Sequence, residues 1–428
     1  MAPGVRRCGP AVKDLPVSPR TPGVPETPAG GSRSPDASLG TGAGLGVGAD
    51  AARSAEITVP APPHGVAGIQ GADGAAVAGG VLGTAGTGVA GGTTVTRGPA
   101  GGAENGADAR PPLTERLAAA FSAVVDTVRG AFVGDERTVR LSLCCLMAEG
   151  HLLVEDHPGV GKTTLAKALA HSLGLGFGRV QFTADLLPAD VTGAMVLDRD
   201  SGRIVFRPGP VFTNILLADE LNRASPKAQS ALLESMEERQ VSTDGVSHAL
   251  PQPFMVIATQ NPYDAAGTFP LPHSQRDRFL LRLSVGYPDR QAEDELLAGV
   301  RSRPAPESLD VVGSPEFLRA FSRAVLRAHT SPEVRGYVLD LVGETRAHPD
   351  LTVGASPRAS LAVLRAASAL AVSSGRDYVI PDDVKVVAEP ALGHRVVVHP
   401  AAELAGVTPS SAIAEILSRL VVPVGRAR

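Results

Sequence analysis

Hydrophobic and polar residues are distributed differently in successive parts of the chain. Residues 1 to about 110 are mostly Gly, Ala, Pro, Ser and Thr, with few large apolar side chains. Such a composition buries too little apolar surface to offset the entropy lost on ordering, so we expect a disordered tail at 1–110. A tethering or docking role for this tail is one hypothesis, and a solvated extension without a function is the alternative.

Order is expected to begin near Thr114, a candidate helix N-cap, because apolar residues then recur at helical spacing at Leu117, Phe121, Val124 and Val128. Beyond this helix, short apolar runs alternate with helical patterns, which predicts an α/β fold with a parallel sheet covered by helices. The runs read HLLVE, RVQFT, NILLA, FMVIATQ and LLRLSV.

Strand-like runs stop after YPDRQAEDELL, and mainly helical segments follow from about residue 290. Two of these segments, SPEFLRAFSRAVLRAH and SPEVRGYVLDLVGETR, begin with Ser-Pro, which is typical of an N-cap and the first helical residue. The sequence therefore predicts an α/β core at 111–288 and an all-helical domain at 289–428.

Composition narrows the classes of function. The 428 residues include 40 basic and 44 acidic side chains, so the formal net charge of −4 gives no global field to attract nucleic acid. Three cysteines form neither a disulfide framework nor a metal-ligand spacing, which favours a reducing compartment. No apolar stretch has the length of an export signal or a membrane span, so we expect a soluble, cytoplasmic protein without membrane insertion.

The segment EDHPGVGKTT joins the run HLLVE to a helical pattern, which is the context of a phosphate-binding loop. Asp156 stands where the usual pattern has its first glycine, so an ordinary strand-to-helix turn is the alternative. Gly159 and Gly161 would let backbone amides surround phosphate oxygens. Lys162 would reach the β- and γ-phosphates, and the Thr163 hydroxyl would ligate Mg²⁺. The predicted nucleotide-binding residues of this loop are His157, Pro158, Gly159, Val160, Gly161, Lys162, Thr163 and Thr164.

Two further strand patterns end in polar residues. NILLADELNRA places Asp219 and Glu220 after an apolar run, where Asp219 would orient Mg²⁺ and Glu220 would act as general base toward the attacking water. FMVIATQNP ends in Gln260 and Asn261, whose amides could hold that water or the γ-phosphate, although Asn before Pro is also a common turn former.

The segment RDRF places Arg276 and Arg278 at the start of the last strand pattern. Each is a candidate arginine finger, and a surface charge is the alternative for each.

From about residue 114 to the C-terminus, the chain resembles the MoxR family of AAA+ ATPases. In MoxR-like proteins the loop often begins with Glu-Asp or Glu-Gly, so the resemblance makes Asp156 a family variant. The resemblance rests on the segments EDHPGVGKT, QFTADLLPADVTGAMV, FRPGPVFTNILLADELNRASPKAQSALLESMEERQV, FMVIATQNPYDAAGTFPLPHSQRDRFLLRL and SPRASLAVLRAA.

The resemblance implies an ATP and Mg²⁺ site with further roles. Asn261 is similar to sensor 1, Arg358 to sensor 2, and Arg278 to the finger that reaches a neighbouring subunit's γ-phosphate. Val133 and Gly134 resemble the stretch beside the adenine. The family usually has an acidic residue at the position of His273 and an apolar one at that of Arg276, so both arginines stay candidates for the finger. His273 is either a pH sensor or a solvated helix residue.

The segment GAMVLDRDSGRIVFRPGP resembles the family's insertion in the second helix, and its Asp-Ser-Gly at 200–202 suits a hairpin turn. This hairpin would either contact a client protein or serve as a rigid decoration.

The resemblance implies a homo-oligomeric ring, a hexamer by analogy, that binds ATP between core and lid and moves the lid on hydrolysis. Its work would be chaperone-like maturation of a client protein or enzyme complex, or metal-cofactor insertion, with a partner that carries a von Willebrand factor A domain.

Rival functions are a nucleic-acid motor, a nucleotide-gated scaffold and a small-molecule kinase. Glu220 argues against the scaffold, since binding alone needs no general base, and the helical lid has no place in such a kinase. The insertion's mixed charges lean against the motor: Arg199, Arg203, Arg207, Asp190, Asp198 and Asp200.

Overall fold

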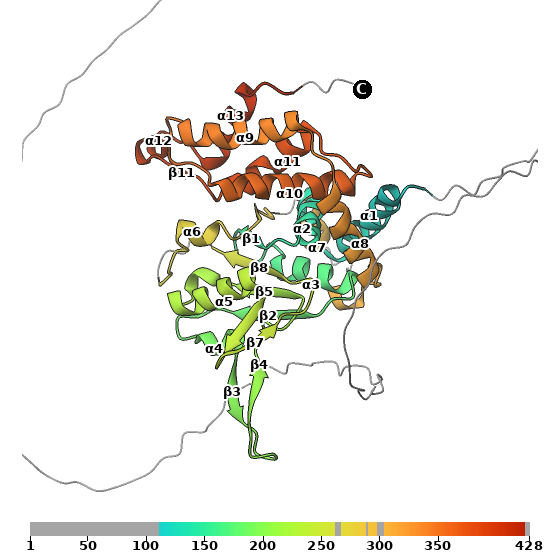
Figure 1. Ribbon diagram of the computed structural model, residues 1–428, viewed down its shortest axis with the longest axis vertical. Coiled ribbons are helices and arrows are strands. Elements are labelled where there is room, and N and C mark those ends of the chain that lie inside the picture. Colours follow the sequence, from blue (N-terminus) through green and yellow to red (C-terminus); the bar gives the residue numbers. More distant parts are fainter. Residues whose placement is uncertain (1–110, 262–266, 288–289, 298–303, 424–428) are drawn as a thin grey trace, which may run out of the picture. The chain divides into compact units, whose positions relative to one another are not determined.

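The computed structural model describes residues 111–261, 267–287, 290–297 and 304–423 (Figure 1). The tail expected at 1–110 lies outside them. The predicted parallel sheet is confirmed: five strands pair in parallel in the order β2-β5-β8-β1-β9, and they match the five apolar runs. Their bounds are β1 Leu152–Glu155, β2 Phe177–Gln181, β5 Ile215–Asp219, β8 Met255–Gln260 and β9 Leu281–Leu283.

The central strands are apolar on both sides, because successive side chains point to opposite faces of the sheet. Leu152 and Val154 pack into one cluster of buried residues with α1, α2 and α3, whereas Leu153 packs into a second cluster with α5. The N-terminal helices are α1 Leu113–Ala131, α2 Glu136–Met147, α3 Lys162–Ser172, α4 Pro188–Thr192, α5 Pro226–Glu238, α6 His273–Arg276 and α7 Arg290–Leu297.

The first helix begins slightly earlier than the sequence suggested. Its four apolar residues are buried as expected, but Thr114 is not the N-cap: the cap is Pro112, whose carbonyl already accepts a hydrogen bond from Arg116 N at 3.1 Å. Proline fixes φ near the helical value, so the chain can enter the helix directly after it.

Two antiparallel hairpins extend from the core. The predicted turn is confirmed: Gly202, at φ 66°, lies between β3 Gly193–Leu197 and β4 Ile204–Pro208. This hairpin projects away from the sheet in Figure 1. The second hairpin pairs β6 Gln240–Thr243 with β7 Val246–Ala249. The Phe206 and His248 rings stack at 4.0 Å between centroids, so the two hairpins touch.

The C-terminal part is mainly helical, and its Ser-Pro signals are confirmed: Ser314 and Ser331 cap α8 and α9 through their hydroxyls. It is not all-helical, because β10 Leu351–Val353 pairs with β11 Val397–Val398. The helices are α8 Pro315–Arg327, α9 Pro332–Ala347, α10 Pro357–Ser373, α11 Pro381–Leu392, α12 Pro400–Leu404 and α13 Pro409–Arg419, with 3₁₀ turns η1 Leu221–Arg223 and η2 Pro306–Ser308.

The helical lid and the α/β core share one apolar interior. Buried residues of α10, α11 and α13 belong to the same cluster as those of α1, α2 and β1. The Arg395 side chain is only 2% exposed and pairs with Asp277 of the core at 2.6 Å. The packing is therefore continuous across the domain boundary expected near residue 288.

A buried histidine fixes the start of β1. His151 Nδ1 accepts a hydrogen bond from Val256 N at 3.0 Å, so Nε2 carries the proton and donates to Met236 O at 3.1 Å. The bond accepted by Nδ1 requires the neutral ring. Burial accordingly lowers the pKa of His151 to about 4 from the ordinary 6.5.

This histidine predicts a loss of stability in acid. The unfolded chain binds the His151 proton below pH 6.5 and the folded chain only near pH 4, so the stabilisation is complete above 6.5 and falls as the pH drops between these values. At about 1.4 kcal/mol per pH unit, the contribution of His151 to the free energy of unfolding falls by about 3 kcal/mol over this range. We expect His151→Gln to flatten this pH slope in urea unfolding measured from pH 7 to 4. An unchanged slope would contradict the assignment.

Candidate nucleotide site

The loop after β1 has the geometry of an anion cradle. Gly159 and Gly161 adopt positive φ angles of 87° and 95°, which favour glycine. Gly161 is the N-cap of α3, and within the described ranges no side chain caps that helix, so its first backbone N–H groups can face phosphate oxygens. A Cβ placed on Gly159 would meet no atom within 4 Å, so space lies beside the loop. The residues therefore fit a bound phosphate chain.

Asp156 is a structural anchor at the root of this loop. Asp156 is only 5% exposed. Its Oδ2 accepts hydrogen bonds from Ser284 Oγ (3.0 Å), Gly286 N (2.8 Å) and Val285 N. Its Oδ1 accepts a hydrogen bond from His157 N (3.1 Å). The three donors to Oδ2 follow β9, where the chain leaves the core for the lid. The missing glycine is thus replaced by a carboxylate that ties the loop to this connection.

Lys162 lies inside the loop and near the acids. Its ammonium donates to the carbonyl oxygens of Asp156 and His157, both at 2.8 Å. Burial lowers the pKa of Lys162, and the carboxylates of Asp156 and of the two acids after β5 oppose that shift. The structure therefore brings the lysine and the predicted metal and base residues into one electrostatic neighbourhood.

The two acids at the end of β5, its last residue Asp219 and the following Glu220, are held by partners that sequence reasoning missed. Thr259 Oγ1 donates to Asp219 at 2.7 Å and accepts from Glu220 N at 2.9 Å, so one hydroxyl fixes both residues. Arg179 pairs with Asp219 at 2.6 Å, and Arg223 pairs with Glu220 at 2.8 Å. Glu220 also adopts the left-handed region at φ 56°, uncommon for a residue with a side chain.

The other predicted residues are placed by their neighbours in the chain. Phe132 lies against it, because a Cβ on Gly161 would meet the Phe132 ring at 3.4 Å, and Val133 and Gly134 follow directly. Asn261 comes directly after β8, and its carbonyl accepts from Asn222 Nδ2 at 3.4 Å.

The donor set also fits Mg²⁺, which prefers oxygen ligands. The Thr163 hydroxyl at the start of α3 and the Asp219 carboxylate are the predicted ligands. Asp219 is only 14% exposed at its side chain, and both of its oxygens have partners in the described residues. A bound ion would therefore coordinate in competition with Arg179 or through water.

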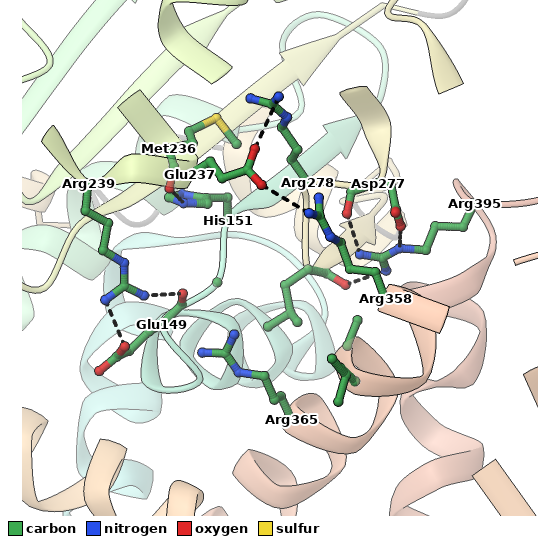
Figure 2. Close-up of a pocket in the computed structure, with 14 residues that line it drawn as sticks. Glu149, His151, Met236, Glu237, Arg239, Asp277, Arg278, Arg358, Arg365 and Arg395 are labelled. Carbon is green, nitrogen blue, oxygen red and sulfur yellow. Dashed lines mark hydrogen bonds and ion pairs between the residues drawn. The ribbon is translucent and has the colours of Figure 1, made fainter. Parts of the chain in front are cut away.

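Two of the predicted arginines, Arg278 and Arg358, lie together in a pocket away from the phosphate loop (Figure 2). Arg278 and Arg358 both pair with the Glu237 carboxylate, at 3.2 and 3.1 Å. The pocket that they line also contains His151 and Leu280, which precede β1 and β9, whereas the phosphate loop follows β1. Four residues of strand, about 13 Å, separate the two edges.

The structure distinguishes the two candidate finger residues. Arg276 ends α6 and does not line the pocket of Arg278. Burial lowers the pKa of Arg276, with a smaller opposing effect from Glu155 at the end of β1. His273 bonds the carbonyl oxygen of Arg395 at 2.8 Å, so it joins α6 to the lid.

A parallel α/β core with a glycine-lysine-threonine loop, acids at the end of a neighbouring strand and a helical lid defines an AAA+ ATPase. The family described as "ATPase family associated with various cellular activities (AAA)" matches residues 151–281, and the AAA lid domain matches 343–416.

Relatives narrow the class further. YeaC of Bacillus subtilis is 44% identical, over 71% of this chain and 94% of its own length. Chaperone MoxR1 of Mycobacterium tuberculosis is 38% identical, over 74% and 86%. Protein MoxR of Paracoccus denitrificans is 34% identical, over 64% and 88%. A solved Cytophaga hutchinsonii protein, named as a candidate ATPase, is 34% identical, with a TM-score of 0.68 over 73% of this chain and 97% of that one. The chain belongs to the MoxR family of AAA+ ATPases.

Membership of this family makes the chain an ATP-hydrolysing enzyme. Across the parts of the chain that the structure describes, none of the helices combines the length and the apolar character needed to span a bilayer.

The anchor role of Asp156 predicts the effect of restoring the usual glycine. Asp156→Gly removes the acceptor of buried backbone N–H groups, so we expect a loss of about 2–3 kcal/mol in the free energy of unfolding, measured with urea. Asp156→Asn, which keeps the size and one acceptor oxygen, should lose less. If Asp156→Gly is as stable as the wild type, the carboxylate is only a tolerated variant.

Proposed function

We propose that the chain couples Mg²⁺-dependent ATP hydrolysis to the remodelling or maturation of a client protein, as a ring of identical subunits. Membership of the MoxR family supports the chaperone-like role. One observation supports the ring: Arg278 and Arg358, which both pair with Glu237, lie far from the phosphate loop of their own subunit. Those arginines would serve the nucleotide of a neighbouring copy.

In the proposed mechanism the residues of one subunit hold ATP. Backbone amides at 159–163 and the Lys162 ammonium would bind the phosphates, and Thr163 with Asp219 would hold Mg²⁺, which neutralises charge on the phosphate oxygens. Val133 and Gly134 would lie beside the adenine. These contacts bind and orient the nucleotide without neighbouring subunits.

Hydrolysis would need groups from both subunits. Glu220 takes a proton from the attacking water, and Asn261 orients that water beside the γ-phosphate. Arg278 and Arg358 of the adjacent copy offset the negative charge that develops as the bond to the leaving ADP breaks. Glu220 must first leave Arg223, since that ion pair occupies Oε2, one of the two oxygens that can accept the proton.

The β3–β4 hairpin is the segment that we propose for client contact. It carries exposed apolar residues on both strands, and Leu197 (65% exposed) lies opposite Ile204 (68% exposed) in the register. Exposed apolar side chains on a projecting hairpin suit contact with another protein. A partner with a von Willebrand factor A domain and a hexameric ring are the finer parts of this proposal.

A mixing experiment tests whether arginines act between subunits. Glu220→Gln lacks the base and Arg278→Ala lacks the finger, so each alone should hydrolyse ATP at least a hundredfold more slowly than the wild type. Their equimolar mixture should regain roughly a quarter of wild-type activity, because one junction in four of a random ring pairs an intact base with an intact finger. Steady-state phosphate release measures the recovery.

The same mixture with Arg358→Ala in place of Arg278→Ala should also recover. If only the mixture that contains Arg278→Ala recovers activity, Arg358 acts on the nucleotide of its own subunit. No recovery in either mixture, with each variant still binding ATP, would contradict the ring and favour a nucleotide-gated scaffold. Stimulation of the wild type by DNA but not by protein clients would instead favour a nucleic-acid motor.

A further inference from the structure

Glu237, the last residue but one of α5, joins three separate elements (Figure 2). Its Oε2 pairs with Arg278, which precedes β9, at 3.2 Å. Its Oε1 pairs with Arg358, in the first turn of α10, at 3.1 Å. One carboxylate therefore binds an arginine of the α/β core and an arginine of the lid at the same time.

The charges around this carboxylate are unevenly matched. In the same pocket, of about 370 Å³, Arg239 pairs with Glu149 at 2.9 Å and Arg395 pairs with Asp277 at 2.6 Å, each one to one. Glu237 instead faces two arginines. Arg365 also lines this pocket, so its five arginines outnumber its three acids, and this excess of positive charge suits the pocket to attract a further anion.

Both guanidinium groups keep donors for such an anion. A guanidinium has five N–H donors. The bonds described for Arg278 go to Glu237 and, from Nη1 at 2.6 Å, to Leu233 O, and the bond described for Arg358 goes to Glu237. Glu237 can therefore hold the two side chains in place while their other N–H groups bind phosphate oxygens.

We propose that Glu237 is a positioning residue for the neighbouring subunit's nucleotide: it aligns Arg278 and Arg358 as one preformed pair, so that they bind the same γ-phosphate together. Long arginine side chains lose conformational freedom when they bind, and a pair that is already ordered loses less. This inference rests on the proposed function, because it requires the pair to act across a subunit junction.

The role can be tested by placing Glu237→Ala on one side of the junction at a time. In the mixture of Glu220→Gln with Arg278→Ala, active junctions take their arginines from the Glu220→Gln copy. Adding Glu237→Ala to that copy should lower the recovered kcat about tenfold, with the KM for ATP unchanged, because the arginines are then held less well. Adding Glu237→Ala to the Arg278→Ala copy should leave recovery unchanged.

A matched control comes from the next residue. Glu238 is exposed on the same helix, and no ion pair is described for it, so Glu238→Ala in the Glu220→Gln copy should leave recovery unchanged. Glu237→Gln, which keeps one acceptor oxygen, should lose less activity than Glu237→Ala in the same position.

The outcomes separate the two proposals. Equal losses with Glu237→Ala on either side would mean a general structural role and would overturn the positioning assignment. Recovery unaffected on both sides would overturn it as well. Failure of the parent mixture to recover would overturn the ring itself, and the positioning role with it.

Discussion

The parallel pairing of β1 with β9 is the constraint on which the arrangement of the site depends. The phosphate loop follows β1, whereas Arg278 precedes β9, so parallel strands place them at opposite edges of the sheet. Rotation of its side chain cannot bring Arg278 across the length of the strands to the phosphate loop of the same subunit. The lid adds Arg358 to the same edge as Arg278. The topology itself therefore separates the residues that we propose to bind the nucleotide from those that we propose to stabilise charge.

Electrostatic pairing runs through the whole site. Asp219 is held by Arg179, Glu220 by Arg223, and Glu237 by two arginines. Each acid that the mechanism uses thus already has a cationic partner in the described residues. In the proposed mechanism, nucleotide, Mg²⁺ and water would displace or share these partners, so the free energy of binding would include the exchange of ion pairs.

The sequence was most informative where the signal is local. Alternating apolar runs predicted the strands, the Ser-Pro pairs predicted two helix starts, and the glycine-lysine-threonine loop predicted the anion cradle. The rest depends on contacts between distant parts of the chain. Asp156 reads as a defect in a motif until Val285 and Gly286, about 130 positions later, provide its donors. The short β10–β11 pair has too few residues for a period-two pattern, and arginine partners have no fixed spacing.

The continuous apolar interior of core and lid has a mechanical consequence. Swinging the lid away from α1 and α2 would expose buried alanine and valine side chains of α10 to water and separate Arg395 from Asp277. If hydrolysis moves the lid against the core, as expected from the sequence, the movement would therefore cost free energy wherever these contacts separate. In the proposed ring, each subunit would then move as a rigid body. The conformational change would occur at the interfaces between subunits, and it would depend on the state of the nucleotide bound there.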